Sequence, residues 1–235
     1  MHSAEQYEKD ANTLRNAMKG WGTDEGPIIE LTAKRTNADR QQIIKFYKSS
    51  FGRDLFEDLN DELGGCLRKV VVGMYRTPVD YDCHELHAAM KGIGTDEDTL
   101  IEILATKSNS QLKEIKLRFK ELFKKDLEEE VKDECGGELG RLLISILQCN
   151  RSEETEIDTS KLDKDLKDLY EAGEGQWGTD DSVFNKIFTL RSRNELRYIN
   201  REYLKRQGRT LIDVVDLEFS GDVKKLLHTI LQALI

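Results

Sequence analysis

The sequence has little proline, no long apolar run and no excess of basic residues. Only 2 of its 235 residues are proline, which excludes a Pro-rich linker or low-complexity stalk. The longest aliphatic stretch near the middle, Leu142–Leu147, is far shorter than the roughly 20 apolar residues of a membrane-spanning helix. The first ten residues are polar and acidic, so they lack the apolar segment of a signal peptide. We therefore expect a cytoplasmic protein.

The cysteines and the net charge exclude further classes. Cys66, Cys83, Cys135 and Cys149 are scattered without a CxxC spacing, which predicts reduced thiols and no structural zinc site. With 45 acidic and 36 basic residues the net charge is −9. A nucleic-acid groove needs clustered Lys and Arg, so we expect no nucleic-acid partner. Taken alone, the same charge also argues against binding to an anionic membrane.

The chain repeats itself. Met18–Glu25 recurs as Met90–Glu97 after 72 residues, and Gly175–Asp181 is a third copy a further 84 residues along. The 12 additional residues of the second interval fall near the polar run Arg151–Thr159, which reads as a linker. Internal repetition on this scale indicates that the chain is built from similar consecutive units. The predicted division is three repeats at 1–76, 77–150 and 161–235, with a linker at 151–160.

Each repeat is predicted to be entirely helical. In the second repeat, Leu112, Ile115 and Phe119 follow helical spacing. Val70–Val72 is β-branched but belongs to a similar pattern and is also expected to be helical. Helix starts are marked by the capping-box patterns that begin at Thr36, Ser108 and Ser192 and by the N-cap residues Asp54, Asp126 and Thr210. The starts and stops predict an all-α fold with about five short helices in each repeat.

The recurring Gly-x-Gly-Thr-Asp segment lies between two predicted helices. Two glycines that flank one residue allow positive φ angles, which turn backbone carbonyls outward. Calcium prefers such oxygens together with a bidentate carboxylate. An acid lies 40 residues after the second glycine of every copy, at Glu62, Glu134 and Glu218. The alternative is that each segment is only a tight turn, in which glycine ends one helix and Thr-Asp caps the next.

The Met-Lys-Gly-x-Gly-Thr-Asp loops and their distant acids resemble the type II calcium sites of annexins, and the resemblance covers essentially the whole chain. It implies a curved array of helical repeats that binds acidic phospholipid in a calcium-dependent manner. It also implies calcium ligands: the carbonyls of the loop and the carboxylate of the acid. These are Met18, Gly20, Gly22 and Glu62 in the first site, Met90, Gly92, Gly94 and Glu134 in the second, and Gly173, Gln176, Gly178 and Glu218 in the third, where an inserted residue shifts the register.

The resemblance also suggests weaker secondary calcium sites and a membrane-contact surface. The secondary sites would use Thr23 with Glu25 and Thr95 with Glu97. The x position of the three loops is occupied by Trp21, Ile93 and Trp177, and such side chains suit the headgroup boundary of a membrane. The alternative for the two tryptophans is ordinary partial burial in the core. Calcium held at the loops would reverse the local charge, which removes the objection raised by the net charge.

The sequence offers no catalytic grouping, so we expect a non-catalytic protein. The segment Gly173–Gly178 matches GxGxxG, but a helical stretch precedes it where a dinucleotide site needs a strand. His84 and His87 are three residues apart, whereas a zinc-protease helix has its histidines four apart. We expect both histidines on a solvated helix face.

The predicted location is the cytoplasm, with reversible attachment to the cytosolic face of membranes as a peripheral protein. The alternative function is a cytoskeleton-associated structural or scaffold protein in which calcium binding is incidental, since divergent annexin-like chains such as giardins are associated with the cytoskeleton. Annexin cores usually contain four repeats, and the first packs against the fourth. With three repeats, we expect an exposed apolar patch on the first, filled by a homodimer partner or by further chain.

Overall fold

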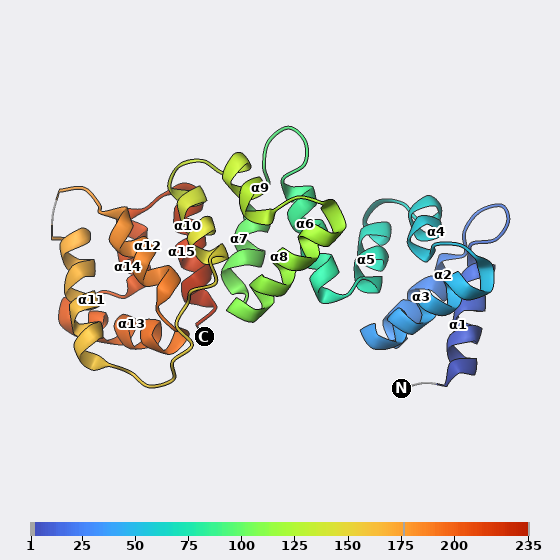
Figure 1. The fold of residues 1–235 in the computed structure, drawn as a ribbon, viewed down its shortest axis with the longest axis horizontal. Coiled ribbons are helices and arrows are strands. Elements are labelled where there is room, and N and C mark those ends of the chain that lie inside the picture. The colour runs from blue at the N-terminus through green and yellow to red at the C-terminus, as the bar shows by residue number, and fades with distance from the viewer. Residues whose placement is uncertain (1–2, 176, 235) are drawn as a thin grey trace. The chain divides into compact units, whose positions relative to one another are not determined.

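The computed structural model describes residues 3–175 and 177–234, and the regular structure in this part of the chain is α-helical. This confirms the predicted all-α class, with five helices in each repeat (Figure 1). The helices are α1 (Ala4–Ala17), α2 (Glu25–Lys34), α3 (Asn37–Phe51), α4 (Leu55–Glu62), α5 (Gly65–Tyr75), α6 (Pro78–Ala89), α7 (Glu97–Thr106), α8 (Asn109–Phe123), α9 (Leu127–Glu134), α10 (Gly137–Leu147), α11 (Thr159–Ala172), α12 (Asp181–Leu190), α13 (Arg193–Gln207), α14 (Leu211–Glu218) and α15 (Gly221–Gln232).

The helices begin where the sequence places capping residues. Thr36, Ser108 and Ser192 each form a complete capping box at the start of α3, α8 and α13. Asp54 and Asp126 cap α4 and α9 through their side chains. Each cap satisfies backbone N–H groups that have no partner within the helix. The repeated pattern of helix starts therefore reflects local chemistry that recurs in the sequence.

The chain forms two compact units, residues 1–81 and 82–235, and helix α6 crosses the division. In the first unit, α1 packs against α2 and α3 while α5 contacts α2, α3 and α4. The core between these helices contains Leu14, Ile43, Tyr47, Leu59 and Tyr75, all of which are fully buried. Burial of such side chains contributes roughly 1.5–3 kcal/mol each.

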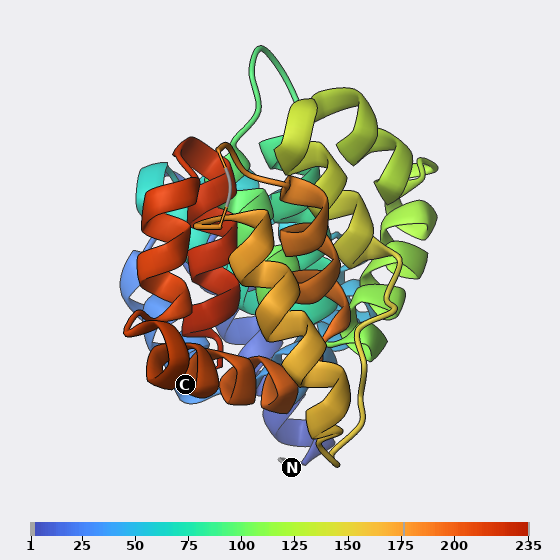
Figure 2. The ribbon, with the colours of Figure 1, turned by 90° about the vertical axis from the view of Figure 1, so that its left-hand side faces the viewer.

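The second unit contains the second and third repeats. Helix α7 packs against α15, and α10 packs against α12, α7 and α15. These four helices lie side by side in the unit (Figures 1 and 2). Their facing side chains are apolar and buried, including Leu104, Leu143, Phe188 and Leu227. The second and third repeats thus share one core.

A largely buried ion pair recurs in every repeat. Its acid lies on the first helix of the repeat, and its base is the residue directly after the second helix. Arg35 donates two hydrogen bonds to Asp10, of 2.6 and 2.9 Å, and Arg191 donates two to Asp165, of 2.5 and 2.9 Å. Lys107 takes this place in the second repeat and pairs with Asp82. Each pair ties the first helix to the end of the second across 25 or 26 residues.

All four cysteines are free thiols, and three of them are buried. Burial raises the pKa of Cys135 to about 11. No helix in residues 3–175 and 177–234 is both long and apolar enough to cross a bilayer.

Candidate functional site

The first two Gly-x-Gly loops have the backbone conformation that their glycines allow. Gly20 and Gly22 have φ angles of 113° and 82°, and Gly92 and Gly94 have φ angles of 120° and 85°. An L side chain rarely adopts these angles. The loops connect α1 to α2 and α6 to α7. Their conformation is therefore set by the glycines and recurs because the glycines recur.

The same backbone hydrogen bond closes all three loops. The amide of Asp24 donates to the carbonyl of Ala17, and the amide of Asp96 donates to that of Ala89, both at 2.9 Å. In the third repeat the amide of Asp180 donates to the carbonyl of Ala172 at 2.7 Å. The third loop is one residue longer between these two groups, so the residue after its first anchor is Gly173, in the place of Met18 and Met90. Gly178 has a φ angle of 87°, and Gln176 lies outside the described residues.

A threonine in each loop joins the loop to its distant acid. The Thr23 hydroxyl donates to Oε2 of Glu62 at 2.5 Å, and the Thr179 hydroxyl donates to Oε2 of Glu218 at 2.6 Å. The corresponding bond from Thr95 to Glu134 is longer, at 3.3 Å. The structure thus brings together each loop and the acid that the 40-residue spacing singled out.

From the sequence, Thr23 and Thr95 were expected only in the secondary calcium sites, and no role was predicted for Thr179. The available signal was the recurrence of threonine directly after the second glycine in all three loops. Glu25 and Glu97 lie in the first turn of α2 and α7, where a negative charge interacts favourably with the helix dipole. The charges of Glu97 and Glu134 add to burial in raising the pKa of Cys135, so both acids lie near that thiol.

Gly173 is in contact with the third acid. A Cβ atom at this position would lie 3.3 Å from Cδ of Glu218 and 3.4 Å from Phe184. A larger side chain would therefore displace the carboxylate. Glycine leaves this space to the carboxylate of Glu218, whereas the other two loops carry methionine at the same place.

The tips of the loops point into solvent. Trp21, Ile93 and Trp177 are all fully exposed. The alternative in which the two indole rings are partly buried in the core is wrong.

Comparison with known proteins agrees with the repeated loop geometry. The Annexin family model matches residues 9–74, 81–146 and 164–230. The chain belongs to the annexin family. Among curated relatives, annexin A13 of Mus musculus is 42% identical over 231 residues, which are 98% of this chain and 73% of that protein. Annexin A11 of Homo sapiens is 42% identical over 226 residues, 96% of this chain, but the match spans only 45% of its length.

Solved annexin structures have the same fold as this annexin. Annexin III superposes with a TM-score of 0.92 at 34% identity, covering 97% of this chain and 71% of that one. A calcium-bound annexin, annexin (Sm)1, superposes with a TM-score of 0.80 at 29% identity, covering 100% and 71%. The family is known for calcium-dependent binding to phospholipid, and calcium binding by the family is supported by that structure.

The donor atoms at the loops of this annexin suit a hard cation. Within residues 3–175 and 177–234, no three His, Cys, Asp or Glu side chains converge in a way that could hold a metal. A cation at these loops would therefore be held mainly by backbone oxygens with one carboxylate. Calcium accepts such a set, because it takes 6–8 oxygen ligands in flexible geometry.

His84 and His87 do not lie on a solvated face, so that prediction is wrong. Both are half-buried. The His87 ring stacks on Phe123 with centroids 4.1 Å apart, and His84 meets the same ring edge-on at 5.2 Å. Burial, with the nearby charges of Lys91 and Lys125, lowers the pKa of His87. Their periodicity was compatible with an outer face, but the aromatic residues of α8 cover them.

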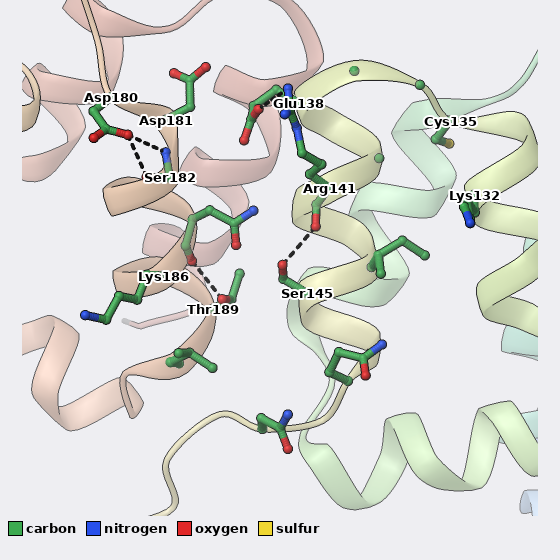
Figure 3. A pocket seen from close by; sticks show the side chains of 18 of the residues that line it. Lys132, Cys135, Glu138, Arg141, Ser145, Asp180, Asp181, Ser182, Lys186 and Thr189 are labelled. Atoms are coloured by element: carbon green, nitrogen blue, oxygen red, sulfur yellow. Dashed lines mark hydrogen bonds and ion pairs between the residues drawn. The ribbon is translucent and has the colours of Figure 1, made fainter.

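A groove of about 1140 Å³ lies between α10 and α12 of this annexin (Figure 3). Arg141 projects from α10 and pairs with Glu138 of the same helix at 2.9 Å. On the other side, Asp180 accepts a hydrogen bond from the amide of Ser182 at 3.1 Å. The groove is lined by Thr179 and Asp180 of the third loop and by Cys135, Gly136 and Gly137 after α9, but not by Glu134 or Glu218.

Proposed function

We propose that this annexin binds acidic phospholipid membranes in a calcium-dependent and non-catalytic manner through its three Gly-rich loops. One observation carries the proposal. In each repeat, a threonine of the loop is hydrogen-bonded to the acid that lies 39 residues further along the chain, beside a fully exposed apolar side chain.

The proposed calcium ligands are the loop carbonyls and the single carboxylate of each repeat. When bound, calcium would supply positive charge and coordination positions that lipid phosphate oxygens can fill. Thr23 and Thr179 orient the carboxylates of Glu62 and Glu218 toward their loops. The full set is Met18, Gly20, Gly22 and Glu62; Met90, Gly92, Gly94 and Glu134; and Gly173, Gln176, Gly178 and Glu218. Thr23 with Glu25, and Thr95 with Glu97, remain proposed secondary ligands.

The exposed tips and the net charge complete the proposal. Trp21, Ile93 and Trp177 would enter the headgroup boundary, where aromatic and apolar side chains are stabilised. Without calcium, a chain of net charge −9 is repelled by an anionic surface. The loops would thus make binding conditional on calcium, and the protein would attach reversibly to the cytosolic face of a membrane.

The decisive experiment is co-sedimentation with phosphatidylserine vesicles across a calcium titration. The expected result is pelleting with calcium and none with a chelator. Glu62→Gln, Glu134→Gln and Glu218→Gln should each raise the calcium concentration needed, and the triple variant should not pellet. A triple control, Glu57→Gln with Glu129→Gln and Glu171→Gln, removes the same charge from exposed positions outside the loops and should behave like the wild type.

A cytoskeletal scaffold is the alternative that the same experiment distinguishes. Equal pelleting with vesicles in calcium and in chelator would contradict the proposal. Calcium-independent pelleting with actin filaments or microtubules, unchanged in the triple glutamine variant, would favour the scaffold instead.

A further inference from the structure

The third Gly-rich loop lacks the side chain that fixes the start of the other two. Met18 and Met90 are the first residues of their loops, and they are buried, at 3% and 5% exposed. Each methionine therefore packs into the core of its own repeat and holds the start of its loop. Gly173 takes this place in the third repeat and has no side chain to pack. The third loop must be held by another residue.

Glu174, the next residue, turns inward where the other loops carry an exposed lysine. Lys19 and Lys91 stand at this register, and both are exposed. The side chain of Glu174 is only 16% exposed. Its carboxylate accepts a hydrogen bond of 2.9 Å from the hydroxyl of Tyr203 and forms an ion pair with Arg209. Tyr203 belongs to α13 and Arg209 to the turn that follows it, so Glu174 joins the loop to the second half of its repeat.

The first repeat forms the same cluster without its loop. Tyr47 corresponds to Tyr203, and its hydroxyl donates to Oδ2 of Asp58 at 2.5 Å. Arg53 corresponds to Arg209 and donates to the same carboxylate, at 2.9 and 2.5 Å. The acid of this cluster lies on α4. In the first repeat the tyrosine and the arginine therefore place no constraint on the loop.

The third repeat lacks that acid on its fourth helix. Val214 stands at the register of Asp58 and is fully buried. Without the carboxylate of Glu174, the hydroxyl of Tyr203 would lose its hydrogen bond at a residue that is 1% exposed. A buried polar group that loses its partner costs free energy. The third repeat thus takes from its loop the acid that the first repeat takes from its fourth helix.

The second repeat has no need of such an acid. Phe119 stands at the register of Tyr203 and has no hydroxyl group. Lys125, at the register of Arg209, pairs with Glu130 of α9 at 2.8 Å. Among the three loops as the structure describes them, the third is the one tied to this cluster.

The anchored segment is in contact with the acid of the third site. Gly173 directly precedes Glu174, and a Cβ atom at Gly173 would lie 3.3 Å from Cδ of Glu218. Burial, the hydrogen bond to Glu174 and the nearby charge of Glu218 raise the pKa of Tyr203. The hydroxyl therefore stays protonated and remains a donor, and both acids lie near it. A displacement of Glu174 would move Gly173 relative to the carboxylate of Glu218.

We propose that Glu174 is a positioning residue of the third calcium site: its contacts with Tyr203 and Arg209 hold the start of the loop against Glu218 before calcium binds. The inference rests on the proposed function, because it takes the loop to be a calcium site. Glu174 acts through the loop and is not itself a ligand. A loop that is already ordered loses less entropy when it binds the ion, which favours binding.

Two matched variants separate positioning from folding. Tyr203→Phe and Tyr47→Phe each remove a buried hydroxyl that donates to a carboxylate, and the second repeat carries phenylalanine at this register. Both variants should lower the midpoint of urea unfolding. Tyr203→Phe should also weaken the third calcium site about tenfold, as the loss of an outer-shell partner does. Tyr47→Phe should leave the first site unchanged, because its acid lies outside the loop.

Terbium bound in place of calcium reports the two sites separately. The chain has two tryptophans, so a Trp21→Phe background leaves Trp177 to sensitise terbium at the third loop, and Trp177→Phe leaves Trp21 at the first. Calcium that displaces the terbium gives the affinity of each site. Glu174→Ala should weaken the third site about 10–100-fold. Lys19→Ala removes the exposed residue at the same register and should leave the first site unchanged.

Hydrogen exchange in chelator tests the anchor without any metal. The amides of Gly175 and Asp180 donate to the carbonyls of Tyr170 and Ala172, both at 2.7 Å. In Glu174→Ala these amides should exchange about tenfold faster, as expected when a hydrogen bond to a charged group no longer holds the loop closed. The amide of Asp24 in the first loop should exchange at the same rate as in the wild type.

The outcomes separate this inference from the proposed function. A wild type whose loops bind neither terbium nor calcium would overturn both. An unchanged third site in Glu174→Ala, or unchanged exchange of its loop amides, would overturn the positioning role alone. Equal weakening of the first site by Tyr47→Phe and of the third by Tyr203→Phe would also overturn it, because lost stability would then explain both effects. If Glu174→Ala does not fold, the two tyrosine variants decide.

Discussion

The Thr23 hydroxyl donates a hydrogen bond of 2.5 Å to Oε2 of Glu62, which lies 39 residues later at the end of α4. A second contact from the same hydroxyl reaches the backbone carbonyl of Glu62 at 3.2 Å. The threonine therefore holds both the side chain and the main chain of the acid against the loop. Equivalent bonds join Thr95 to Glu134 and Thr179 to Glu218.

If this bond orients the calcium-binding carboxylate, a variant without the threonine hydroxyl should bind calcium more weakly. Such a variant keeps every proposed carbonyl and carboxylate ligand of the primary sites. Loss of an outer-shell partner typically costs about 10–100-fold in metal affinity. Thr179→Val should therefore weaken the third site by that order, measured by calorimetry, while Thr179→Ser keeps the hydroxyl and should bind nearly as the wild type does. Thr95→Val should have a smaller effect, because its bond is the longest. Equal affinities for Thr179→Val and Thr179→Ser would refute this role.

The two tryptophans are the only ones in the chain, and both lie fully exposed at loop tips. Their fluorescence should shift to shorter wavelength when calcium and phosphatidylserine vesicles are both present, since the indole leaves water. Trp21→Ala and Trp177→Ala should each weaken vesicle binding about tenfold, because an apolar side chain gains roughly 1.5–3 kcal/mol on burial. Unfolding free energies should change by less than about 0.5 kcal/mol. If the emission does not shift on vesicles that pellet the protein, the loop tips do not enter the bilayer and the prediction is wrong.

The buried pair of Asp165 and Arg191 should matter more than an exposed one in the same repeat. Both side chains are nearly inaccessible, at 4% and 11% exposed. Arg191→Ala leaves the carboxylate buried without its partner and should reduce the unfolding free energy by about 3–5 kcal/mol. Arg206→Ala removes an exposed pair with Asp163 and should cost under about 1 kcal/mol. Urea unfolding of both variants measures the difference, and similar costs would contradict the prediction.

Lys124 ends α8 in the left-handed region, with a φ angle of 58°. The equivalent residues of the other repeats are Gly52 and Gly208, which have φ angles of 67° and 73°. An L residue in this region costs roughly 1–2 kcal/mol, so Lys124→Gly should stabilise the fold by about 1 kcal/mol. Lys120→Gly, within the same helix, should instead destabilise it by about 1 kcal/mol. A lower denaturation midpoint for Lys124→Gly would show that the lysine side chain outweighs the backbone strain.

The stacked His87 should make the stability depend on pH. Burial, with Lys91 and Lys125, holds its pKa below the ordinary value of 6.5, so the folded state favours the neutral ring. As the pH falls below 6.5, the unfolded chain binds the proton more readily, and stability declines until the folded pKa is passed. Each unit of pKa difference is worth about 1.4 kcal/mol. His87→Gln should flatten this part of the profile of unfolding free energy against pH. If the slope is unchanged, the pH dependence arises from other titrating groups.

Much of the fold was predictable from local chemistry. The capping boxes at Thr36, Ser108 and Ser192 and the helical spacing around Leu112 gave the helix starts, because an N-cap or an amphipathic stripe acts over one or two turns. The positive φ angles of the loop glycines were equally predictable from the sequence, because a positive φ angle depends on the residue itself. His84 and His87 were misjudged because the rings that cover them belong to another helix.

The sequence by itself determined the recurrence of the loop and acid pattern, the helices and the positive φ angles of the loop glycines, whereas the set of candidate ligands came from the resemblance to annexins. It could do so because the same short patterns occur three times, and each pattern acts locally. Only the tertiary structure decided which groups meet: Thr179 with Glu218, His87 with Phe123, and α7 with α15. It also decided that Val70 is exposed while Leu142 and Leu226 at the same register are buried. Burial depends on a partner surface, and no single segment encodes the presence of its partner.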